Sequence, residues 1–258
     1  MLFLVRHQPL NQEDAMSVAI ITGASRGLGA ALASELAERG WELILDARGS
    51  DALQQVAGQL PSTQVDAIAG DVRDPEHRQA LVDAAVLRGG IDLLVNNASG
   101  LGPSPQPNLA DYPLDVLTQL YDTNVIAPLA LIQLALPGLR QRAGTIVNIT
   151  SDAGQEPFAG WGGYGSTKAA LEQLGNILGA EEPDVQVYTF DPGDMRTQMH
   201  QEAFPNEDIS DRPEPETVVP AFLALLAGTP ASGRYRAADF RTSDLPGPES
   251  PTDSTVTS

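Results

Sequence analysis

Short apolar runs alternate along this chain with longer segments in which apolar residues recur at helical spacing. The short runs, typical of buried strands, lie at residues 17–22, 41–47, 64–69, 91–95, 145–149 and 185–190. The helical spacing, as at Leu28, Leu32 and Leu36, predicts helices over residues 28–40, 51–60, 75–88, 111–141 and 164–179. Strands and helices that alternate on this scale predict an α/β domain, in which helices cover both faces of a parallel, doubly wound sheet.

The two ends of the chain depart from this pattern. Residues 1–15 precede the first strand and Met16 stands directly before it, so the true start is either Met1 or Met16. Beyond about Phe240 the sequence is rich in Ser, Thr, Pro and Asp, and it has almost no apolar residues. Such a segment buries too little apolar surface to offset the entropy lost on ordering. We expect an N-terminal extension over residues 1–15, one domain over 16–240 and a disordered tail over 241–258.

Composition excludes several classes of protein and site. The 258 residues include no cysteine and only three scattered histidines, so we expect no disulfide, no thiolate nucleophile and no metal site. The formal net charge of −19 disfavours binding to nucleic acid or to an anionic membrane surface. No apolar run reaches the roughly 18 residues of a membrane span, and no secretory signal precedes the first strand. The chain is therefore expected to be cytoplasmic.

A glycine-rich loop, Thr22-Gly-Ala-Ser-Arg-Gly-Leu-Gly29, follows the first strand and opens a helix. Gly23 permits a tight turn, Gly27 lets the backbone approach a pyrophosphate, and Gly29 allows close packing of helix against strand. The helix N-terminus adds amide donors and a positive dipole. A glycine-rich turn that binds nothing has the same composition, so further motifs have to decide.

Three such motifs follow in order: Asn96-Asn97-Ala98 after a strand, Tyr164-Gly-Ser-Thr-Lys168 in a helix, and Pro192-Gly193 after the last predicted strand. Together with the TGxxxGxG spacing of the loop, they resemble the short-chain dehydrogenase/reductase family over about residues 17–240. The resemblance implies a single-domain Rossmann-type fold and a nicotinamide cofactor. It also implies a small-molecule carbonyl or alcohol substrate and a homodimer or homotetramer. Two departures are Ser99, where the family usually has glycine, and Asp194 after Pro192-Gly193.

Tyr164 and Lys168 stand four residues apart, so a helix places them on the same face. A tyrosine has a reference pKa of about 10, and an adjacent ammonium is expected to lower it by roughly 1–3 units. General acid–base catalysis is most effective when the pKa lies near the operating pH. Ser151, at the end of a strand, can donate a hydrogen bond to a substrate carbonyl oxygen as charge develops there. Strand alternation points the neighbouring Thr150 to the other face.

The resemblance assigns further roles. Lys168 would bind the nicotinamide ribose, Asn124 would hold a water for proton relay, and Asn96 would line the cofactor with Ala98. The catalytic set implied is Ser151, Tyr164, Lys168 and Asn124. The cofactor-binding set implied is Gly23, Ser25, Arg26, Gly27, Leu28, Gly29, Arg48, Asp71, Val72, Asn97, Ala98, Tyr164, Lys168, Pro192, Gly193, Met195 and Thr197.

The choice of cofactor depends on the end of the second strand. A carboxylate there accepts a hydrogen bond from the free 2′-hydroxyl of NAD, whereas an arginine pairs with the 2′-phosphate of NADP. Alignment to the family puts Arg48 at the arginine position and Ala47 at the aspartate position, and Arg26 adds a second guanidinium. A register shift of one residue would put Asp46 on the ribose and restore NAD. We expect NADP(H), with NAD(H) as the alternative.

The resulting hypothesis is reversible hydride transfer between C4 of the nicotinamide and a carbonyl carbon, in the direction of carbonyl reduction. Residues 100–108 and 195–213 are expected to form a lid over the substrate. Two alternatives stay open: an NADP(H)-binding sensor or scaffold without turnover, and an NAD-dependent alcohol dehydrogenase of the same fold. The complete Ser-Tyr-Lys-Asn set favours an enzyme over a sensor.

Overall fold

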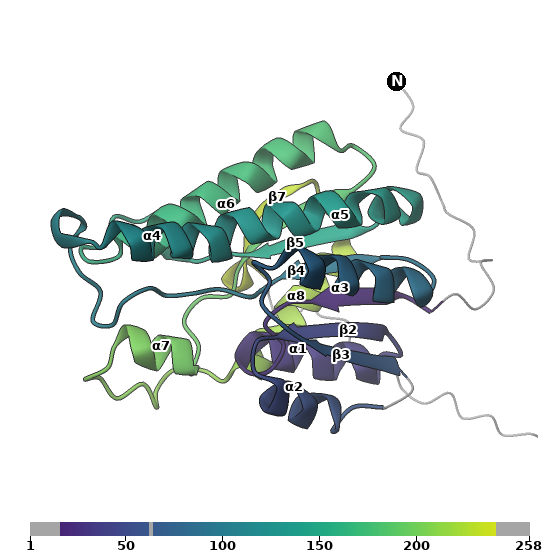
Figure 1. The fold of residues 1–258 in the computed structure, drawn as a ribbon, viewed down its shortest axis with the longest axis horizontal. Coiled ribbons are helices and arrows are strands. Elements are labelled where there is room, and N and C mark those ends of the chain that lie inside the picture. Colours follow the sequence, from purple (N-terminus) through teal and green to yellow (C-terminus); the bar gives the residue numbers. More distant parts are fainter. Residues whose placement is uncertain (1–15, 62–63, 241–258) are drawn as a thin grey trace, which may run out of the picture.

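A computed structural model describes residues 16–61 and 64–240 of the chain. The expected N-terminal extension and C-terminal tail lie outside the described residues. The described chain forms a seven-stranded parallel sheet of order β3-β2-β1-β4-β5-β6-β7 (Figure 1). Its strands are β1 (Val18–Ile21), β2 (Glu42–Ala47), β3 (Val65–Ala69), β4 (Leu93–Asn96), β5 (Thr145–Ile149), β6 (Gln186–Asp191) and β7 (Gly233–Arg236).

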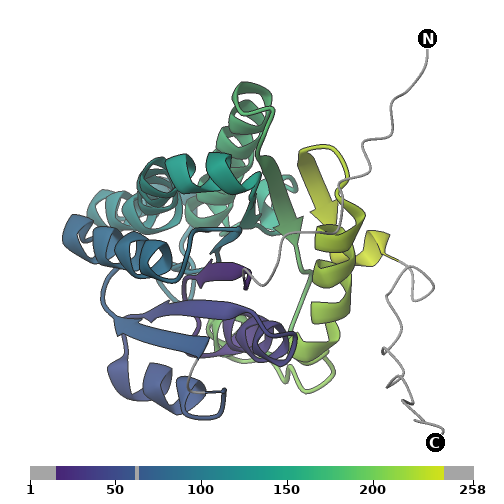
Figure 2. The ribbon, with the colours of Figure 1, turned by 90° about the vertical axis from the view of Figure 1, so that its right-hand side faces the viewer.

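Helices pack on both faces of the sheet, as Figure 2 shows from the side. One face carries α3 (Pro75–Leu87) and α5 (Ala127–Arg142), and the other carries α1 (Gly27–Glu38) and α8 (Val219–Gly228). The remaining helices are α2 (Ser50–Ala57), α4 (Leu114–Tyr121), α6 (Gly162–Glu181) and α7 (Gln198–Ala203). This is the Rossmann-type α/β fold that the alternation of strands and helices predicted.

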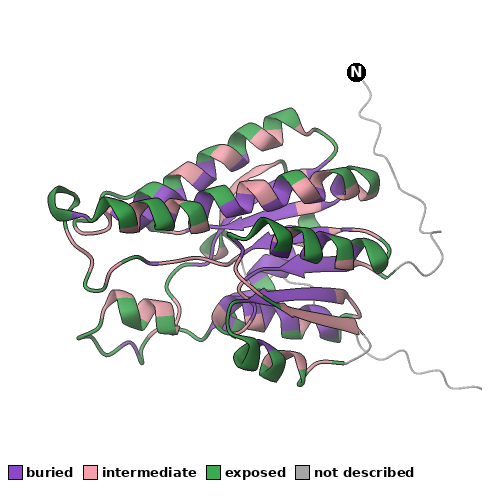
Figure 3. Cartoon of the chain, viewed as in Figure 1, coloured by how far each residue is buried: buried purple, intermediate pink, exposed green. Residues whose placement is uncertain are grey.

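The central strands are buried on both faces, which explains their continuous apolar sequences (Figure 3). In β1, Val18 and Ile20 join the core beneath α3 and α5, whereas Ala19 and Ile21 join the core beneath α1 and α8. All four side chains are fully buried. Because successive side chains of a strand point to opposite faces, one short run contributes to both cores.

Two parts of the fold differ from the pattern-based prediction. The helix expected over residues 111–141 is two helices, α4 and α5, joined by a π-helical turn at Asp122–Ile126. The prediction also ended at the sixth strand and missed α7, α8 and β7. β7 has the sequence Gly-Arg-Tyr-Arg and lies at the edge of the sheet, where few apolar residues are needed.

Among the described helices, only the segment Leu114–Arg142 is long and apolar enough to cross a membrane by length and composition. In this fold, 44% of its most apolar window is buried. Leu131, Ile132, Ala135 and Leu139 of α5 belong to the core beneath the sheet. These four side chains of α5 therefore pack within the domain.

Candidate functional site

The carboxyl ends of β1 and β4 lie side by side at the centre of the sheet, where the chain turns outward in opposite directions. Ligands of open α/β sheets bind at such a switch point. The loops that follow β1, β4, β5 and β6 carry the glycine loop, Asn97, Ser151 and Pro192. The structure thus places three of the four sequence motifs, together with Ser151, at one end of the sheet.

The glycine loop has the geometry of an anion cradle. Gly23 and Gly27 have φ angles of +67° and +56°, a region that favours glycine. A Cβ on Gly29 would stand 2.5 Å from the carbonyl oxygen of Gly23, so only glycine fits there. Helix α1 has no side-chain cap and no acidic residue in its first turn. Its first amides therefore have no side-chain acceptor, which fits a pyrophosphate at this helix N-terminus.

The Asn96-Asn97-Ala98 segment holds this loop in place. Asn97 Nδ2 donates to the carbonyl oxygens of Thr22 (2.8 Å) and Gly23 (3.1 Å). The backbone amides of Asn97 and Ala98 both donate to Thr22 Oγ1 at 3.0 Å. The Asn96 side chain points elsewhere and donates to Asn148 Oδ1 (2.9 Å), which ties β4 to β5. The two asparagines therefore have different structural roles.

At the end of β2, the Asp46 carboxylate is buried, whereas the guanidinium of Arg48, just after the strand, is exposed. Asp46 is 1% exposed, and its Oδ1 lies 2.6 Å from His77 Nε2 of α3. Burial raises the pKa of Asp46, while His77 and the backbone of Gly23 oppose that change by hydrogen bonding. Arg48 is exposed. The Asp46 side chain is therefore engaged inside the protein, whereas Arg48, which follows the strand, is exposed to solvent.

Asp71, Val72 and Arg26 also belong to the predicted cofactor-binding set, and of these Asp71 is close enough to Arg48 to be affected by its charge. Hydrogen bonds from Arg73, and more weakly the charge of Arg48, lower the pKa of Asp71. Val72 is buried, and its carbonyl oxygen accepts a hydrogen bond from Arg78 (2.6 Å). Arg26 is exposed and hydrogen-bonds to the side chain of Gln198, at the start of α7. In this structure Arg26 therefore contacts the predicted lid.

Tyr164 and Lys168 are both buried on α6, with exposed fractions of 8% and 3%. Lys168 Nζ donates to the carbonyl oxygen of Ile149 (2.8 Å) and lies 5.3 Å from the centroid of the Tyr164 ring. Lys168 is also the only lysine of the chain, since every other basic residue among the fifteen is arginine. An amine can lose its proton when it is buried, whereas a guanidinium stays charged.

The pKa of Tyr164 changes in the direction opposite to the expected one. Burial raises it most strongly, and the carboxylates of Asp191 and Asp152 raise it further. A hydrogen bond with Ser99 lowers it in part. The expectation that Lys168 makes Tyr164 more acidic is wrong for this structure. The physical reason is that burial and two nearby carboxylates disfavour the phenolate.

Burial also changes the pKa of the lysine. It lowers the pKa of Lys168 to about 8, and the carboxylates of Glu172 and Asp191 oppose this shift. At neutral pH the ammonium is therefore the main form, and it is lost in the mildly alkaline range. The sequence pattern did not indicate Glu172 or Asp191 as part of this environment.

Ser151 follows β5 and is partly exposed. Its Oγ donates to Asp152 Oδ1 (2.9 Å) and accepts from the backbone amide of Ala153 (3.2 Å). Thr150 Oγ1 donates instead to Glu172 Oε1 (2.7 Å), inside the fold. The two neighbouring hydroxyls thus have different partners, as strand alternation predicted.

Asn124 lies within the π-helical turn and is 1% exposed. Its Nδ2 donates to the Gly100 carbonyl (2.9 Å) and to Thr167 Oγ1 (3.0 Å). Its Oδ1 accepts from the Gly100 amide (2.8 Å) and from Ser99 Oγ (3.2 Å). All hydrogen-bonding positions of the amide are therefore filled by protein, and its predicted role as a water holder stays a prediction.

The two segments expected to form a lid contact one another. Ser104 Oγ donates to the carbonyl oxygen of Glu202 in α7 (2.6 Å). Thr197 caps α7 by accepting from His200 N (3.1 Å), and its methyl carbon lies 3.5 Å from the position of a Cβ on Gly27. Asp194 lies near both His200 and Arg212. The predicted lid segment, residues 195–213, therefore reaches the glycine loop.

Apolar and aromatic side chains pack against Tyr164. Trp161 packs edge-on against the Tyr164 ring, with 5.9 Å between centroids, and also contacts Phe204 of the lid. Leu101 and Met199 belong to the same cluster.

Across residues 16–61 and 64–240, no three His, Asp or Glu side chains are grouped as a metal site.

Comparisons with known proteins agree with this geometry. A family model described as short chain dehydrogenase matches residues 17–208. An uncharacterized oxidoreductase of Staphylococcus aureus (strain MW2) is 32% identical over 213 residues, which cover 81% of this chain and 90% of that protein.

Solved structures give the same result. A short chain dehydrogenase from Shigella flexneri has a TM-score of 0.78 and 28% identity, over 87% of this chain and 92% of that one. An alcohol dehydrogenase from the archaeon Thermococcus sibiricus, complexed with 5-hydroxy-NADP, has a TM-score of 0.77 and 28% identity, over 86% and 95%. The chain belongs to the short-chain dehydrogenase family, as its motifs predicted.

Proposed function

We propose that this protein is an NADP(H)-dependent carbonyl reductase. The nicotinamide, when bound, supplies the hydride that adds to the carbonyl carbon of a small-molecule substrate. Tyr164 then donates its hydroxyl proton to the carbonyl oxygen, and Ser151 donates a hydrogen bond to the same oxygen. Lys168 binds the nicotinamide ribose and holds a positive charge beside Tyr164. The observation that carries the proposal is the buried Tyr164–Lys168 pair at the end of the sheet that holds the glycine cradle.

The raised pKa of Tyr164 supports reduction as the favoured direction. Burial and two carboxylates keep the hydroxyl protonated at neutral pH. A protonated tyrosine can donate a proton to the oxygen of a carbonyl that is being reduced. Alcohol oxidation requires the phenolate, which this environment disfavours.

The end of β2 supports NADP(H) over NAD(H). The Asp46 carboxylate, which would be the ribose acceptor for NAD, is engaged by His77 and is 1% exposed. Arg48 is exposed beside Asp71, where a guanidinium can pair with a 2′-phosphate. A neighbour of the same fold was solved with 5-hydroxy-NADP. Cytoplasmic location stays a prediction from the sequence pattern, and a homodimeric or homotetrameric assembly stays a prediction from the family resemblance.

The test is spectrophotometric turnover of the full-length protein with NADPH and with NADH, over a panel of aldehydes and ketones. We expect a higher kcat/KM with NADPH. Tyr164→Phe should lower kcat by about 10²–10⁴-fold while NADPH still binds, because the variant cannot donate the proton. Tyr121→Phe, which removes a hydroxyl from α4, is the matched control and should keep its activity.

Two outcomes would contradict the proposal. Near-normal turnover by Tyr164→Phe would remove tyrosine from the mechanism. Tight NADPH binding with no turnover of any carbonyl compound would instead favour the sensor or scaffold alternative.

A further inference from the structure

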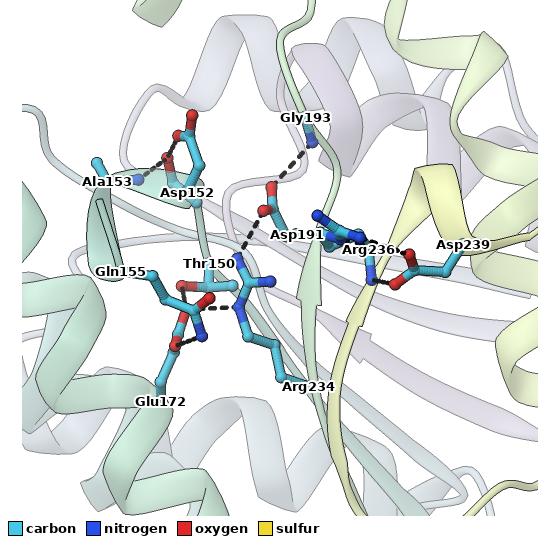
Figure 4. Close-up of polar contacts among 11 residues, drawn as sticks. Thr150, Asp152, Ala153, Gln155, Glu172, Asp191, Gly193, Arg234, Arg236 and Asp239 are labelled. Atoms are coloured by element: carbon cyan, nitrogen blue, oxygen red, sulfur yellow. Dashed lines mark hydrogen bonds and ion pairs between the residues drawn. The ribbon is translucent and has the colours of Figure 1, made fainter.

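Three charged side chains, Arg234, Glu172 and Asp191, form a largely buried network (Figure 4). Arg234 of β7 stands between two carboxylates that come from different elements. Its Nε donates to Glu172 Oε1 of α6 (3.1 Å), and its Nη2 donates to Asp191 Oδ2 at the end of β6 (2.7 Å). One guanidinium therefore joins α6, β6 and β7.

Both carboxylates are otherwise held by the active-site segments. Glu172 also accepts from Thr150 Oγ1 (2.7 Å) and from Gln155 Nε2 (3.2 Å), on either side of Ser151 in sequence. Asp191 Oδ1 accepts from the backbone amide of Gly193 (3.0 Å), in the Pro192-Gly193 turn. The network thus connects the segment that carries Ser151 with the Pro192-Gly193 turn, which belongs to the predicted cofactor-binding set.

The network is largely shielded from water, and its two carboxylates affect Lys168. The exposed fractions of the Glu172, Asp191 and Arg234 side chains are 10%, 6% and 17%. Glu172 lies one helical turn beyond Lys168, and both carboxylates act on the lysine electrostatically. Charges interact strongly where water is excluded, so the net charge of the network affects how stable the Lys168 ammonium is.

We propose that Arg234 is a positioning residue of this active site: by pairing with Glu172 and Asp191, it sets the charge that the Lys168 ammonium meets. With Arg234 present, the two carboxylates and one guanidinium carry a net charge of −1. Arg234 lies outside residues 17–208, which match the family model, so the family motifs do not assign it a role. The proposal rests on the function proposed above, in which Lys168 acts as an ammonium.

The charged groups around Lys168 give the sign of the effect. Tyr164 and Glu172 face it from α6, and Asp191 faces it from β6. Asp152 acts on the neighbouring Tyr164, and β5 contributes only the uncharged carbonyl of Ile149. Removing Arg234 leaves both carboxylates without their shared cation, so the ammonium becomes more stable and the titration of Lys168 moves to higher pH.

Because the chain has a single lysine, the titration of Lys168 can be measured directly. Full-length protein labelled with [ε-¹³C]lysine, and carrying no lysine in its tag, has one side-chain resonance, that of Lys168. Its NMR titration should have a midpoint near pH 8 in the wild type. In Arg234→Gln we expect the midpoint to rise by about one pH unit. In Glu172→Gln it should fall, because one of the two carboxylates is removed and Arg234 remains.

A double variant tests whether charge is the cause. Arg234→Gln combined with Glu172→Gln restores the net charge of −1, so its midpoint should return close to that of the wild type. Arg236→Gln is the matched control from the same strand: its side chain is 60% exposed and pairs with Asp239, so its shift should be much smaller. Circular dichroism at each pH verifies that every variant is folded.

Unchanged midpoints in both single variants, or no return in the double variant, would overturn the role of Arg234. Because removal of one partner from a buried pair can unfold a protein, comparison of Glu172→Gln with the double variant keeps the proposal testable if Arg234→Gln alone does not fold: loss of Arg234 should raise the midpoint in that background too. The titration is read without cofactor or substrate. Its failure is therefore distinct from failure of the proposed function, which is decided by turnover.

Discussion

β2 and β6, on opposite sides of the switch point, both carry a buried aspartate at or near their carboxyl ends. Asp46 of β2 is 1% exposed and contacts His77, whereas Asp191 of β6 is 4% exposed and contacts Arg234. Each carboxylate also accepts a hydrogen bond from the backbone of a glycine turn: Asp46 from Gly23, in the turn after β1, and Asp191 from Gly193, in the turn after β6. The two aspartates therefore support the loops expected to hold the two halves of the cofactor.

The difference between them is the partner of each carboxylate. Asp191 pairs with a guanidinium, which stays protonated at any pH at which proteins fold, whereas Asp46 contacts an imidazole. At the adenosine end the perturbed group is the carboxylate itself, because burial raises the pKa of Asp46. At the catalytic end, a permanent cation balances the carboxylates, and the group that titrates there is the single lysine. The following predictions test this contrast, from the largest expected effect to the smallest.

The largest effect is expected from removal of the titrating group at the catalytic end. Lys168→Met should lower kcat by about 10²–10⁴-fold, because no ammonium remains beside Tyr164. In the wild type, reduction should slow as the pH rises through about 8: burial lowers the pKa of Lys168, so the ammonium is present below that value and lost above it. The pH–rate profile of the variant should lack this limb. A retained limb would assign it to another group.

At the adenosine end, Arg48→Ala should lower kcat/KM for NADPH by about ten- to a hundredfold and leave NADH almost unchanged. A hydrogen bond to a charged group is worth about 1.5–3 kcal/mol, and salt screens this exposed contact toward the lower value. Arg39→Ala, an exposed arginine at the end of α1, is the control. Equal losses with both cofactors, measured at one ionic strength, would contradict the 2′-phosphate role.

Asp46→Asn tests whether charge at the adenosine end depends on pH. Burial raises the pKa of Asp46 above its ordinary 3.8, so the folded state keeps this proton to higher pH than the unfolded state. The corresponding stability is complete below 3.8 and is lost as the pH rises through the raised value. Relative to the wild type, the variant should therefore become more stable as the pH rises through this range, as measured by urea unfolding.

Asp66 offers a control of opposite sign. A hydrogen bond from Arg88 lowers the pKa of Asp66, so its contribution is present above 3.8 and is lost as the pH falls. Asp66→Asn should therefore become less stable, relative to the wild type, over the same rise in pH. Parallel behaviour of the two variants would show that Asp46 is not held as described.

The smallest effect on a pH profile is expected at Asp152, the residue after Ser151. The carboxylate of Asp152 is one cause of the raised pKa of Tyr164, so Asp152→Asn should lower that pKa. The acidic limb of alcohol oxidation with NADP⁺ should then move to lower pH, by less than about one unit because the carboxylate is exposed. Glu156→Gln, also exposed, is the control. A shift to higher pH would contradict this account.

The sequence determined those features that depend on neighbouring residues. Both faces of the central strands are buried, so their apolar runs could be recognised directly, and the order of strands and helices implied the parallel sheet. Tyr164 and Lys168 share a face because helical spacing places residues i and i+4 together. The glycine positions were readable because a turn with positive φ and a close backbone approach both favour glycine.

Only the tertiary structure decided the state of the charged groups. The pKa of Tyr164 rises because the fold buries it and brings Asp191 close, although the two are far apart in sequence. Likewise, β7 carries no apolar pattern, yet its Arg234 meets Glu172 from a position 62 residues away. Burial and long-range charge depend on how distant segments pack, and no local pattern encodes them.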